Sequence, residues 1–261
     1  MTSELPSQTA FTAAAARAAH LIVDSEPCIF ADPLAESLLG DQAEELLSYH
    51  RLRGEHPILA GARAQVVCRS RVAEDLLATG GFSRYVLLGA GLDSFAYRST
   101  GVEVVEVDRP ATQKWKKQAL EKAGISVPAT VAYVSSVAGL SATPTLVGWL
   151  GVTMYLTAAE LDSTLAALPP CELVADHLLP AGLRDAAGDA YVEGVGPVAA
   201  RNGEPWRSFL SPDDMAALLD KHGFEVVRHI RQHDLPEMLD RADSLRPGGL
   251  SVITHARHRL S

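Results

Sequence analysis

The sequence predicts an α/β protein built on one open, doubly wound sheet of seven mostly parallel strands, with a helical cap at the N-terminus. From Tyr85 to Thr254, short apolar runs of strand length alternate with helical segments. Fully apolar strands separated by helices are typical of a parallel sheet covered on both faces. Before Gly80 the pattern is helical only. We therefore predict a single domain over residues 1–261, with residues 1–60 as the cap.

Three helices are expected before the first strand. The alanine-rich stretch Thr12–Ala19, continuing toward Val23, is the first, because alanine has the highest helix propensity. The second spans about Pro33–Leu47. The third spans about Ala62–Ala78, where apolar residues recur at helical spacing and a glycine pair follows.

The predicted strands are short and mostly apolar, and they are Tyr85–Leu88, Val102–Val107, Thr130–Val134, Thr145–Leu150, Glu172–Ala175, Phe224–His229 and Leu250–Thr254. Two helices among them have recognisable starts. Thr157–Glu160 has the spacing of a capping box, and Ser211 precedes a proline and two acids. The stretch Asp176–Leu210 has little periodicity, and we predict residues 177–210 to be an irregular lid or substrate loop.

Composition restricts the class of protein and of partner. The chain has 47% hydrophobic and 21% charged residues and a net charge of −9, which argues against nucleic acid or an anionic membrane as partner. It lacks an apolar run long enough to span a bilayer and an N-terminal signal pattern, so we expect a cytoplasmic protein. The three cysteines, Cys28, Cys68 and Cys171, show no metal-ligand spacing, and no metal site is predicted.

The segment Leu87–Arg98, LLGAGLDSFAYR, carries the strongest local signal for ligand binding. Gly89 and Gly91 allow a tight turn and a close approach to a ligand after a strand. A dinucleotide fingerprint requires a third glycine where Ser94 stands, and Asp93 would repel a pyrophosphate. A cationic, zwitterionic ligand such as S-adenosylmethionine tolerates that acid, so the loop favours this cofactor over NAD. A simple tight turn is the alternative.

An acidic residue follows the second predicted strand. Asp108 lies about 20 residues beyond the glycines, where related folds grip a ribose diol. A carboxylate can accept both hydroxyl protons there. The alternative is an acid at the start of the helix that begins near Pro110.

Longer motifs make the sequence resemble the leucine carboxyl methyltransferase family, in its bacterial branch of polyketide and other small-molecule O-methyltransferases. In family order they are IFADPL at Ile29–Leu34, the helix of Arg63, LLGAGLDSFAYR, VVEVDRP at Val104–Pro110, GVTMYLT at Gly151–Thr157, PWRSFLSPDDMAALLDKHGFEV at Pro205–Val226 and RADSLRP at Arg241–Pro247. The resemblance implies a class I methyltransferase with a Rossmann-like fold that uses S-adenosylmethionine. It also implies that Arg63 holds the cofactor carboxylate, and that the glycine loop and Asp108 hold the methionine moiety and the ribose.

Two positions depart from the family pattern. Leu150 stands where the family has a glutamate that contacts the cofactor, and Ser135 and Ser136 stand where it has an aspartate near the adenine. Either serine can replace that partner. The predicted cofactor site consists of Arg63, Gly89, Ala90, Gly91, Asp93, Asp108, Arg109, Ser135, Ser136 and Leu150.

Methyl transfer from a sulfonium is an in-line displacement that requires a positioned acceptor oxygen and exclusion of water. An ionised carboxylate needs no general base, whereas a phenol or alcohol does. The candidate bases are His177, after the fifth strand, and His20, on the first helix; structural histidines are the alternative. Tyr155, after the fourth strand, is expected to contact the acceptor or to be a core residue.

These observations predict an S-adenosylmethionine-dependent O-methyltransferase that acts on a small molecule, with a carboxylate as the expected acceptor, in secondary metabolism. The alternative is a protein that binds the cofactor without transferring its methyl group, and an NAD-dependent oxidoreductase ranks third. The expected partner is a small-molecule acceptor, and the protein is expected to be a monomer or a homodimer.

Overall fold

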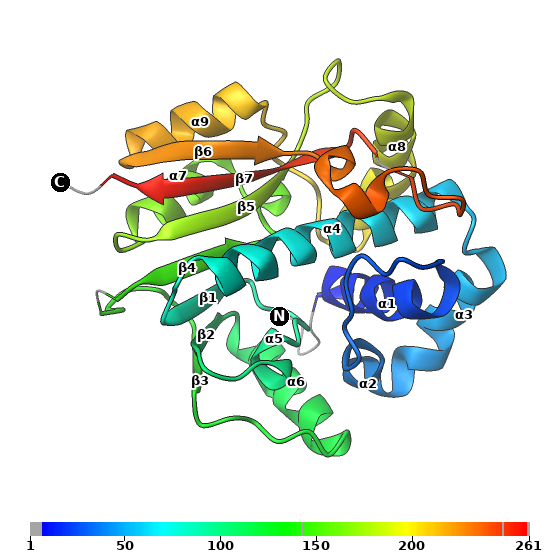
Figure 1. The fold of residues 1–261 in the computed structure, drawn as a ribbon, viewed down its shortest axis with the longest axis horizontal. Coiled ribbons are helices and arrows are strands. Elements are labelled where there is room, and N and C mark those ends of the chain that lie inside the picture. The colour runs from blue at the N-terminus through cyan, green and yellow to red at the C-terminus, as the bar shows by residue number, and fades with distance from the viewer. Residues whose placement is uncertain (1–6, 142, 247, 260–261) are drawn as a thin grey trace.

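The computed structural model describes residues 7–141, 143–246 and 248–259. The first six residues of the predicted cap, and the last residue of the Arg241–Pro247 motif, lie outside these ranges. The chain forms one seven-stranded sheet flanked by helices, with strand order β3-β2-β1-β4-β5-β7-β6 (Figure 1). The strands are β1 Arg84–Leu88, β2 Glu103–Val107, β3 Val131–Val134, β4 Thr145–Trp149, β5 Glu172–Leu178, β6 Phe224–Ile230 and β7 Ser251–His258.

The sheet is mostly parallel, as predicted. Strands β1 to β5 pair in parallel, whereas β7 lies antiparallel between β5 and β6. All seven predicted strands are confirmed. Strands β5 and β7 extend several residues beyond the predicted ends, because they pair along their whole length, from Glu172 with Arg257 to Leu178 with Ser251. Their outer residues are held by this ladder rather than by an apolar run.

Helices cover both faces of the sheet. The helix α4, Pro57–Thr79, packs on one face through residues such as Val67 and Cys68 (Figure 1). On the other face α7, Ala158–Ala166, and α9, Pro212–Lys221, bury Leu161 and Met215 against the strands. The two predicted helix starts are confirmed: Thr157 and Ser211 each form a capping box. Two further helices, α5 Phe95–Arg98 and α6 Pro110–Lys122, follow β1 and β2.

The N-terminal cap consists of α1 Gln8–Val23, α2 Ala35–Leu39 and α3 Ala43–Arg53. The prediction of one continuous helix over Pro33–Leu47 is wrong, because a 3-10 turn separates α2 from α3 at Gly40, whose φ is +56°. A left-handed backbone angle interrupts a right-handed helix. The small side chains of α1 let α2, α3 and α4 pack closely around it.

The prediction that residues 177–210 are irregular is also wrong in part, because they contain the helix α8, Ala186–Arg201. Three glycines and Pro197 lie within this helix and lower its intrinsic propensity, which hides it from a sequence reading. Packing and a cap compensate. The side chain of Asp185 accepts a hydrogen bond from the amide of Gly188 at 2.7 Å, and α8 lies along α4, with Tyr191 against Gly61.

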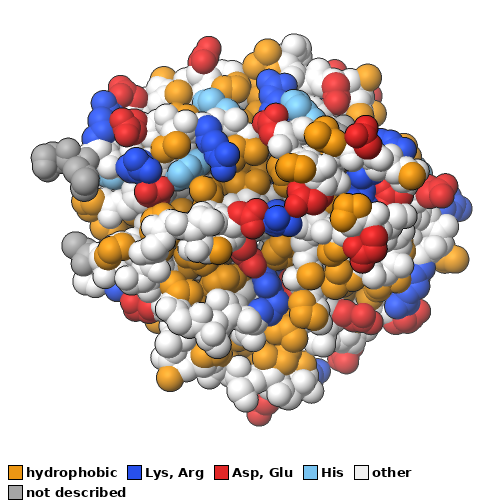
Figure 2. All heavy atoms as spheres, in the orientation of Figure 1, with side chains coloured by type: hydrophobic (Ala, Val, Ile, Leu, Met, Phe, Trp, Pro, Cys, Tyr) orange, Lys and Arg blue, Asp and Glu red, His pale blue; other side chains and the backbone are white. Residues whose placement is uncertain are grey.

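No helix within the described ranges is long and apolar enough to cross a membrane. Figure 2 shows acidic and basic side chains interspersed over the face of the molecule seen in Figure 1.

Candidate active site

A cavity of about 910 Å³ lies beyond the carboxyl ends of β1, β2 and β4. Residues that directly follow these strands form its floor, among them Gly89, Asp108 and Leu150. Helices α1, α3, α4 and α8 and the segments after β4 and α8 supply further lining residues. Ligands of open α/β sheets bind at this edge, and the volume is in the range of a cofactor or drug-sized ligand, about 300 to 1,000 Å³.

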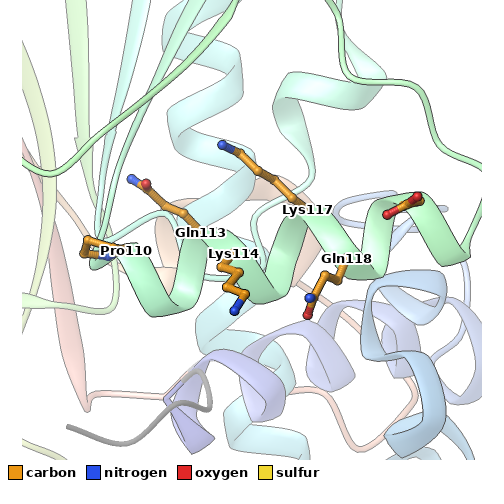
Figure 3. Close-up of a pocket in the computed structure, with 6 residues that line it drawn as sticks. Pro110, Gln113, Lys114, Lys117 and Gln118 are labelled. Carbon is orange, nitrogen blue, oxygen red and sulfur yellow. The ribbon is translucent and has the colours of Figure 1, made fainter.

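A second hollow of about 340 Å³ is bordered by side chains of α6 alone, including Lys114 and Lys117 (Figure 3). It is the grooved surface of one helix. We therefore assign the functional site to the larger cavity.

The glycine loop after β1 has the backbone that its sequence predicts. Gly89 and Gly91 have φ angles of +68° and +46°, in the left-handed region that side chains disfavour. A Cβ atom on Gly89 would also lie 2.6 Å from a methyl carbon of Val152. Glycine at position 89 therefore lets the loop turn at the cavity without a clash.

Asp108 is fixed at the edge of the cavity by two backbone amides. Its Oδ2 accepts a hydrogen bond from the amide of Gly91 and its Oδ1 one from the amide of Arg109, both at 2.7 Å. The side chain does not cap α6, whose N-cap residue Arg109 receives no side-chain cap. Each carboxylate oxygen keeps a lone pair, so Asp108 can accept from a pair of hydroxyl groups on a ligand.

The structure brings most of the other predicted cofactor residues to the same cavity. Its lining includes Ala90, Asp93, Arg109, Ser135 and Leu150. The Oδ1 of Asp93 accepts from the amide that begins α5, at 2.8 Å. Ser136, by contrast, does not line the cavity; its hydroxyl accepts from a nearby backbone amide.

One polar residue of this region was not predicted. Thr112, in the first turns of α6, lines the cavity, is only 2% exposed, and its hydroxyl has no hydrogen-bond partner in the described part of the chain. Buried hydroxyls nearly always have a partner. This hydroxyl lies four positions after Asp108 and is covered by protein atoms.

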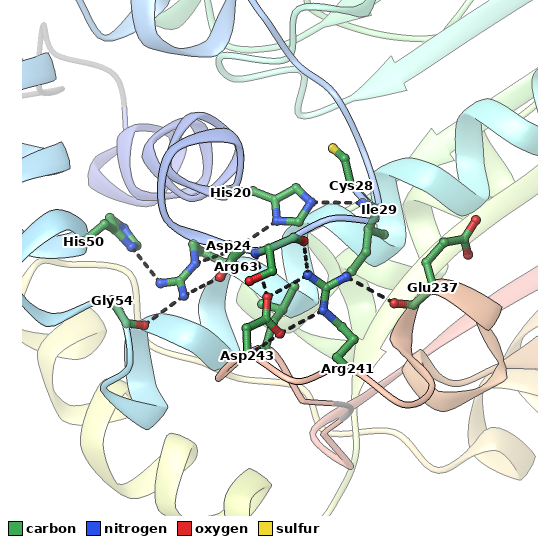
Figure 4. A network of polar contacts seen from close by, with 12 residues as sticks. His20, Asp24, Cys28, Ile29, His50, Gly54, Arg63, Glu237, Arg241 and Asp243 are labelled. Atoms are coloured by element: carbon green, nitrogen blue, oxygen red, sulfur yellow. Dashed lines mark hydrogen bonds and ion pairs between the residues drawn. The ribbon is translucent and has the colours of Figure 1, made fainter.

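Arg63 lies elsewhere, in a buried network at the base of the cap (Figure 4). Its Nε and Nη2 donate to the two carboxylate oxygens of Asp24, both at 2.8 Å, and Nη2 also donates to the carbonyl of Gly54 at 2.8 Å. Its Nη1 donates to the Nδ1 of His50 at 3.2 Å. The side chain is fully buried and does not line the cavity. These contacts support an anchor between α1, α3 and α4, rather than the predicted contact with a cofactor carboxylate.

The two histidines proposed as bases are also held away from the cavity. The Nε2 of His20 accepts from the amide of Ile29 at 3.1 Å, so its proton is on Nδ1, which faces Asp24 at 2.9 Å. The Nδ1 of His177 donates to the carbonyl of Leu210 at 2.9 Å, which leaves Nε2 to accept from Thr254 at 3.0 Å. Both rings are buried and neither lines the cavity. Burial lowers the pKa of His177 to about 4.

Tyr155, the third predicted residue of the reaction site, does line the cavity. Burial raises the pKa of its phenol above the ordinary value, so the hydroxyl stays protonated. It lies in a wall with Tyr191 and Trp206, whose ring planes are nearly parallel at 3° with centroids 6.3 Å apart. We refer to the part of the cavity bordered by these three aromatic residues and α4 as the aromatic lobe.

Helix α4 contributes two polar residues to the aromatic lobe that the sequence reading missed. Gln65 and Arg69 both line the cavity, four positions apart on one helix. The Nη1 of Arg69 donates to Asp176 at 3.1 Å. Residues at this spacing share a helix face. The sequence signal that could have revealed them is a pair of long polar side chains on a face of the predicted helix Ala62–Ala78 that otherwise carries mostly small or apolar residues.

The cover of the cavity joins distant parts of the chain. The amide of Thr9, in the first turn of α1, donates to Glu204, in the segment after α8, at 3.2 Å. Both residues line the cavity. The cap and the segment after α8 therefore close the same opening.

Within the described residues, no group of three or more His, Cys, Asp or Glu side chains is arranged to hold a metal ion.

Comparison with known proteins shows which families and proteins this chain is similar to. The sequence profile of the Leucine carboxyl methyltransferase family matches residues 10–138, which include α4, the glycine loop and Asp108. YktD of Bacillus subtilis (strain 168), which carries the name of an S-adenosyl-L-methionine-dependent methyltransferase, is 28% identical over 285 residues, covering 92% of this chain and 93% of the relative. SCO7813 of Streptomyces coelicolor, with the same kind of name, is 28% identical over 240 residues and 82% of each chain.

Solved structures share the fold. A crystal structure named as a methyltransferase from Thermobifida fusca superposes with a TM-score of 0.61 at 17% identity, covering 99% of this chain and 97% of that one. A protein of the DUF574 family from Streptomyces avermitilis superposes with a TM-score of 0.58 at 14% identity, covering 97% and 98%. At these identities the likeness concerns the fold alone.

Proposed function

We infer that this chain is an S-adenosylmethionine-dependent methyltransferase of the leucine carboxyl methyltransferase family, and we propose that it methylates a carboxylate oxygen of a small molecule. One observation carries the choice of a carboxylate. The cavity that holds the glycine loop and Asp108 continues into the aromatic lobe, which contains the cation Arg69 but neither of the predicted histidine bases.

The residues at the floor of the cavity fit the cofactor. Asp108 presents free lone pairs for the ribose hydroxyls, since each of its oxygens accepts from one backbone amide. Asp93 adds a negative charge beside the glycine loop, which suits a ligand with an amino group and a sulfonium. When bound, S-adenosylmethionine supplies an electrophilic methyl group. Leu150 offers no charge to it, so binding relies on the loop and the acids.

The chemistry that remains for the protein is positioning and exclusion of water. A carboxylic acid with an ordinary pKa near about 4 is ionised at neutral pH, so its oxygen is already nucleophilic. The histidine that does line the cavity, His50, accepts from Arg63 through Nδ1 and so carries its proton on Nε2. Burial and the charge of Arg63 lower the pKa of His50 to about 4. An imidazole with so low a pKa is a poor general base. This favours an acceptor, such as a carboxylate, that needs no base.

The pH dependence of turnover tests the proposal. With a panel of aromatic carboxylic acids and matched phenols as acceptors, release of S-adenosylhomocysteine should occur with acids, and the rate constant should stay nearly level from about pH 8 to about pH 6. A rate that requires a phenol, and that falls tenfold for each pH unit in this range, would contradict a carboxylate acceptor. Binding of S-adenosylmethionine without any turnover would favour a protein that binds the cofactor only.

A further inference from the structure

We propose that one exposed face of α3 is the contact surface of a homodimer, in which the α3 helices of two copies of this chain pack antiparallel across a two-fold axis. The face consists of Glu45, Ser48, Tyr49 and Leu52, and we call it the α3 face. The inference concerns an interaction surface and does not depend on the proposed function.

The α3 face lies opposite the side of the helix that packs on the rest of the cap. Leu47 and His50 are buried on that packed side. The residues of the α3 face recur every three or four positions, so they share the other side. There Tyr49 is 55% and Leu52 80% exposed, and Leu52 is the most exposed large apolar side chain in the described part of the chain.

The end of α1 extends this apolar surface. Leu21 and Ile22, in the last turn of α1, are also exposed. The next residue, Val23, lies beside the end of α3, because a Cβ atom on Gly54 would be 3.4 Å from one of its methyl carbons. The two helices pack side by side (Figure 1). Exposed apolar side chains are thus gathered on the cap, and such gathering marks an interaction surface.

The charges of α3 change sign along the helix. Glu44 and Glu45 lie in its first turn, whereas Arg51 and Arg53 lie in its last. Arg51 reaches back to Glu44 at 3.0 Å. Glu45 and Arg53 are exposed and have no ion-pair partner among residues 7–141, 143–246 and 248–259. A helix with an acidic first turn and a basic last turn is complementary in charge to an antiparallel copy of itself, and the opposed macrodipoles add to the attraction.

A two-fold axis that passes between Tyr49 and Leu52 satisfies both features. It places Tyr49 of each copy against Leu52 of the other. Glu45, one turn before Tyr49, is then within reach of Arg53 of the other copy. Symmetry repeats each of these contacts, so the same surface is supplied by both copies, as a two-fold interface requires.

A second copy fits this surface better than other classes of partner. An acidic protein or an anionic membrane would be repelled by the acidic turn and by the net charge of −9, and a basic protein by the basic turn. The net charges of two copies repel only weakly, because exposed charges more than about 8 Å apart are screened at physiological salt. Two helices of about 16 Å bury less than the about 1,600 Å² of a standard interface, so we expect a weak, reversible dimer.

The α3 face also adjoins the opening of the cavity. Tyr49 belongs both to this face and to the cavity lining. A second copy packed on Tyr49 therefore covers the α3 side of the opening.

Sedimentation velocity of the full chain tests the surface. Over a series from about 1 to about 200 μM, the wild type should shift from monomer toward dimer, as a weak interface requires. Leu52→Glu should weaken the association at least about tenfold, because a carboxylate opposes burial at the contact. Val227→Glu is the matched control, since Val227 is 46% exposed on β6, the edge strand far from the cap (Figure 1). It should change the dissociation constant less than about twofold.

Exchange of charges tests the antiparallel pairing. Glu44→Arg combined with Glu45→Arg makes both ends of α3 basic. Arg51→Glu combined with Arg53→Glu makes both ends acidic. Each double variant should sediment as a monomer at a concentration at which the wild type is a dimer. An equimolar mixture of the two should recover the dimer, because each end then meets the opposite charge, and this recovery also shows that both variants are folded.

Three results overturn the proposal. A wild type that stays monomeric over the whole series lacks the interface. A dimer that Leu52→Glu leaves intact forms through another surface. Double variants that each lose the dimer and do not associate when mixed are not paired through the charges of α3. None of these measurements involves methyl transfer, so their failure is separate from failure of the proposed function.

Discussion

Replacing Arg63 with methionine should destabilise the fold much more than it weakens cofactor binding. The guanidinium is completely buried and donates to both carboxylate oxygens of Asp24, whose side chain is 1% exposed. Without Arg63, Asp24 keeps one hydrogen-bonded side-chain partner in the described part of the chain, His20. Removing one partner of a buried ion pair costs about 3 to 5 kcal/mol, because the other charge is left uncompensated.

Urea unfolding of the apoprotein measures this loss directly. Thermal unfolding gives a second measure. For a chain of this size, about 1 kcal/mol of unfolding free energy corresponds to roughly 2 to 4 °C in Tm, so the Tm of Arg63→Met should be roughly 6 to 20 °C lower. The matched control is the double variant Arg63→Met with Asp24→Leu. Since it has no unpaired charge, its loss of unfolding free energy should be smaller than the sum of the two single losses.

The cofactor provides the opposite test. If Arg63 instead held the carboxylate of the cofactor, as the family resemblance implies, the Kd for S-adenosylhomocysteine would rise about tenfold to a hundredfold. A change of that size with an unaltered unfolding free energy would refute the structural reading of Arg63.

Three further predictions concern the cavity and the buried histidines. Asp108→Ala should raise the Kd for S-adenosylhomocysteine about tenfold to a hundredfold by calorimetry, and a change below about twofold would remove its ribose role. Gly89→Ala should lower the free energy of unfolding by about 1 to 2 kcal/mol in urea, because it strains a left-handed φ and crowds Val152; equal stability would show that the loop adapts. Burial lowers the pKa of both His50 and His177 to about 4, so the unfolded chain binds more protons than the folded one between about pH 6.5 and pH 4. Stability should therefore fall as the pH drops through this window, and equal unfolding free energies at about pH 7 and about pH 5 would contradict it.

The sequence predicted those elements whose signals are local. Apolar runs located all seven strands. Central strands such as β1 and β4 are buried on both faces and need mostly apolar side chains, whereas the edge strands β3 and β6 are partly exposed and keep only part of such a run. Hydroxyl and acid pairs located the starts of α7 and α9, since a capping box involves residues three positions apart. The left-handed turns at Gly89 and Gly91 were predictable for the same reason.

Features that depend on tertiary contacts were not predictable. The helix α8 forms despite three glycines and Pro197 because it packs against α4. A buried arginine that pairs with an acid 39 positions away looks the same in the sequence as one that faces a ligand, so Arg63 was assigned to the cofactor. Gln65 and Arg69 carry no motif that we recognised in the sequence. That they line the cavity follows from how α4 packs over the sheet, which the sequence does not show.

The chemical nature of the methylated product tests the central claim most directly. The protein would be incubated with S-adenosylmethionine labelled in its methyl group and with the carboxylic acid that gives the fastest turnover, and the labelled product would then be treated with mild alkali. A methyl ester hydrolyses under these conditions and releases the label as methanol, and this is the result that we predict. Label that remains on the acceptor after alkali, as in a methyl ether or an N-methyl group, would contradict carboxyl methylation.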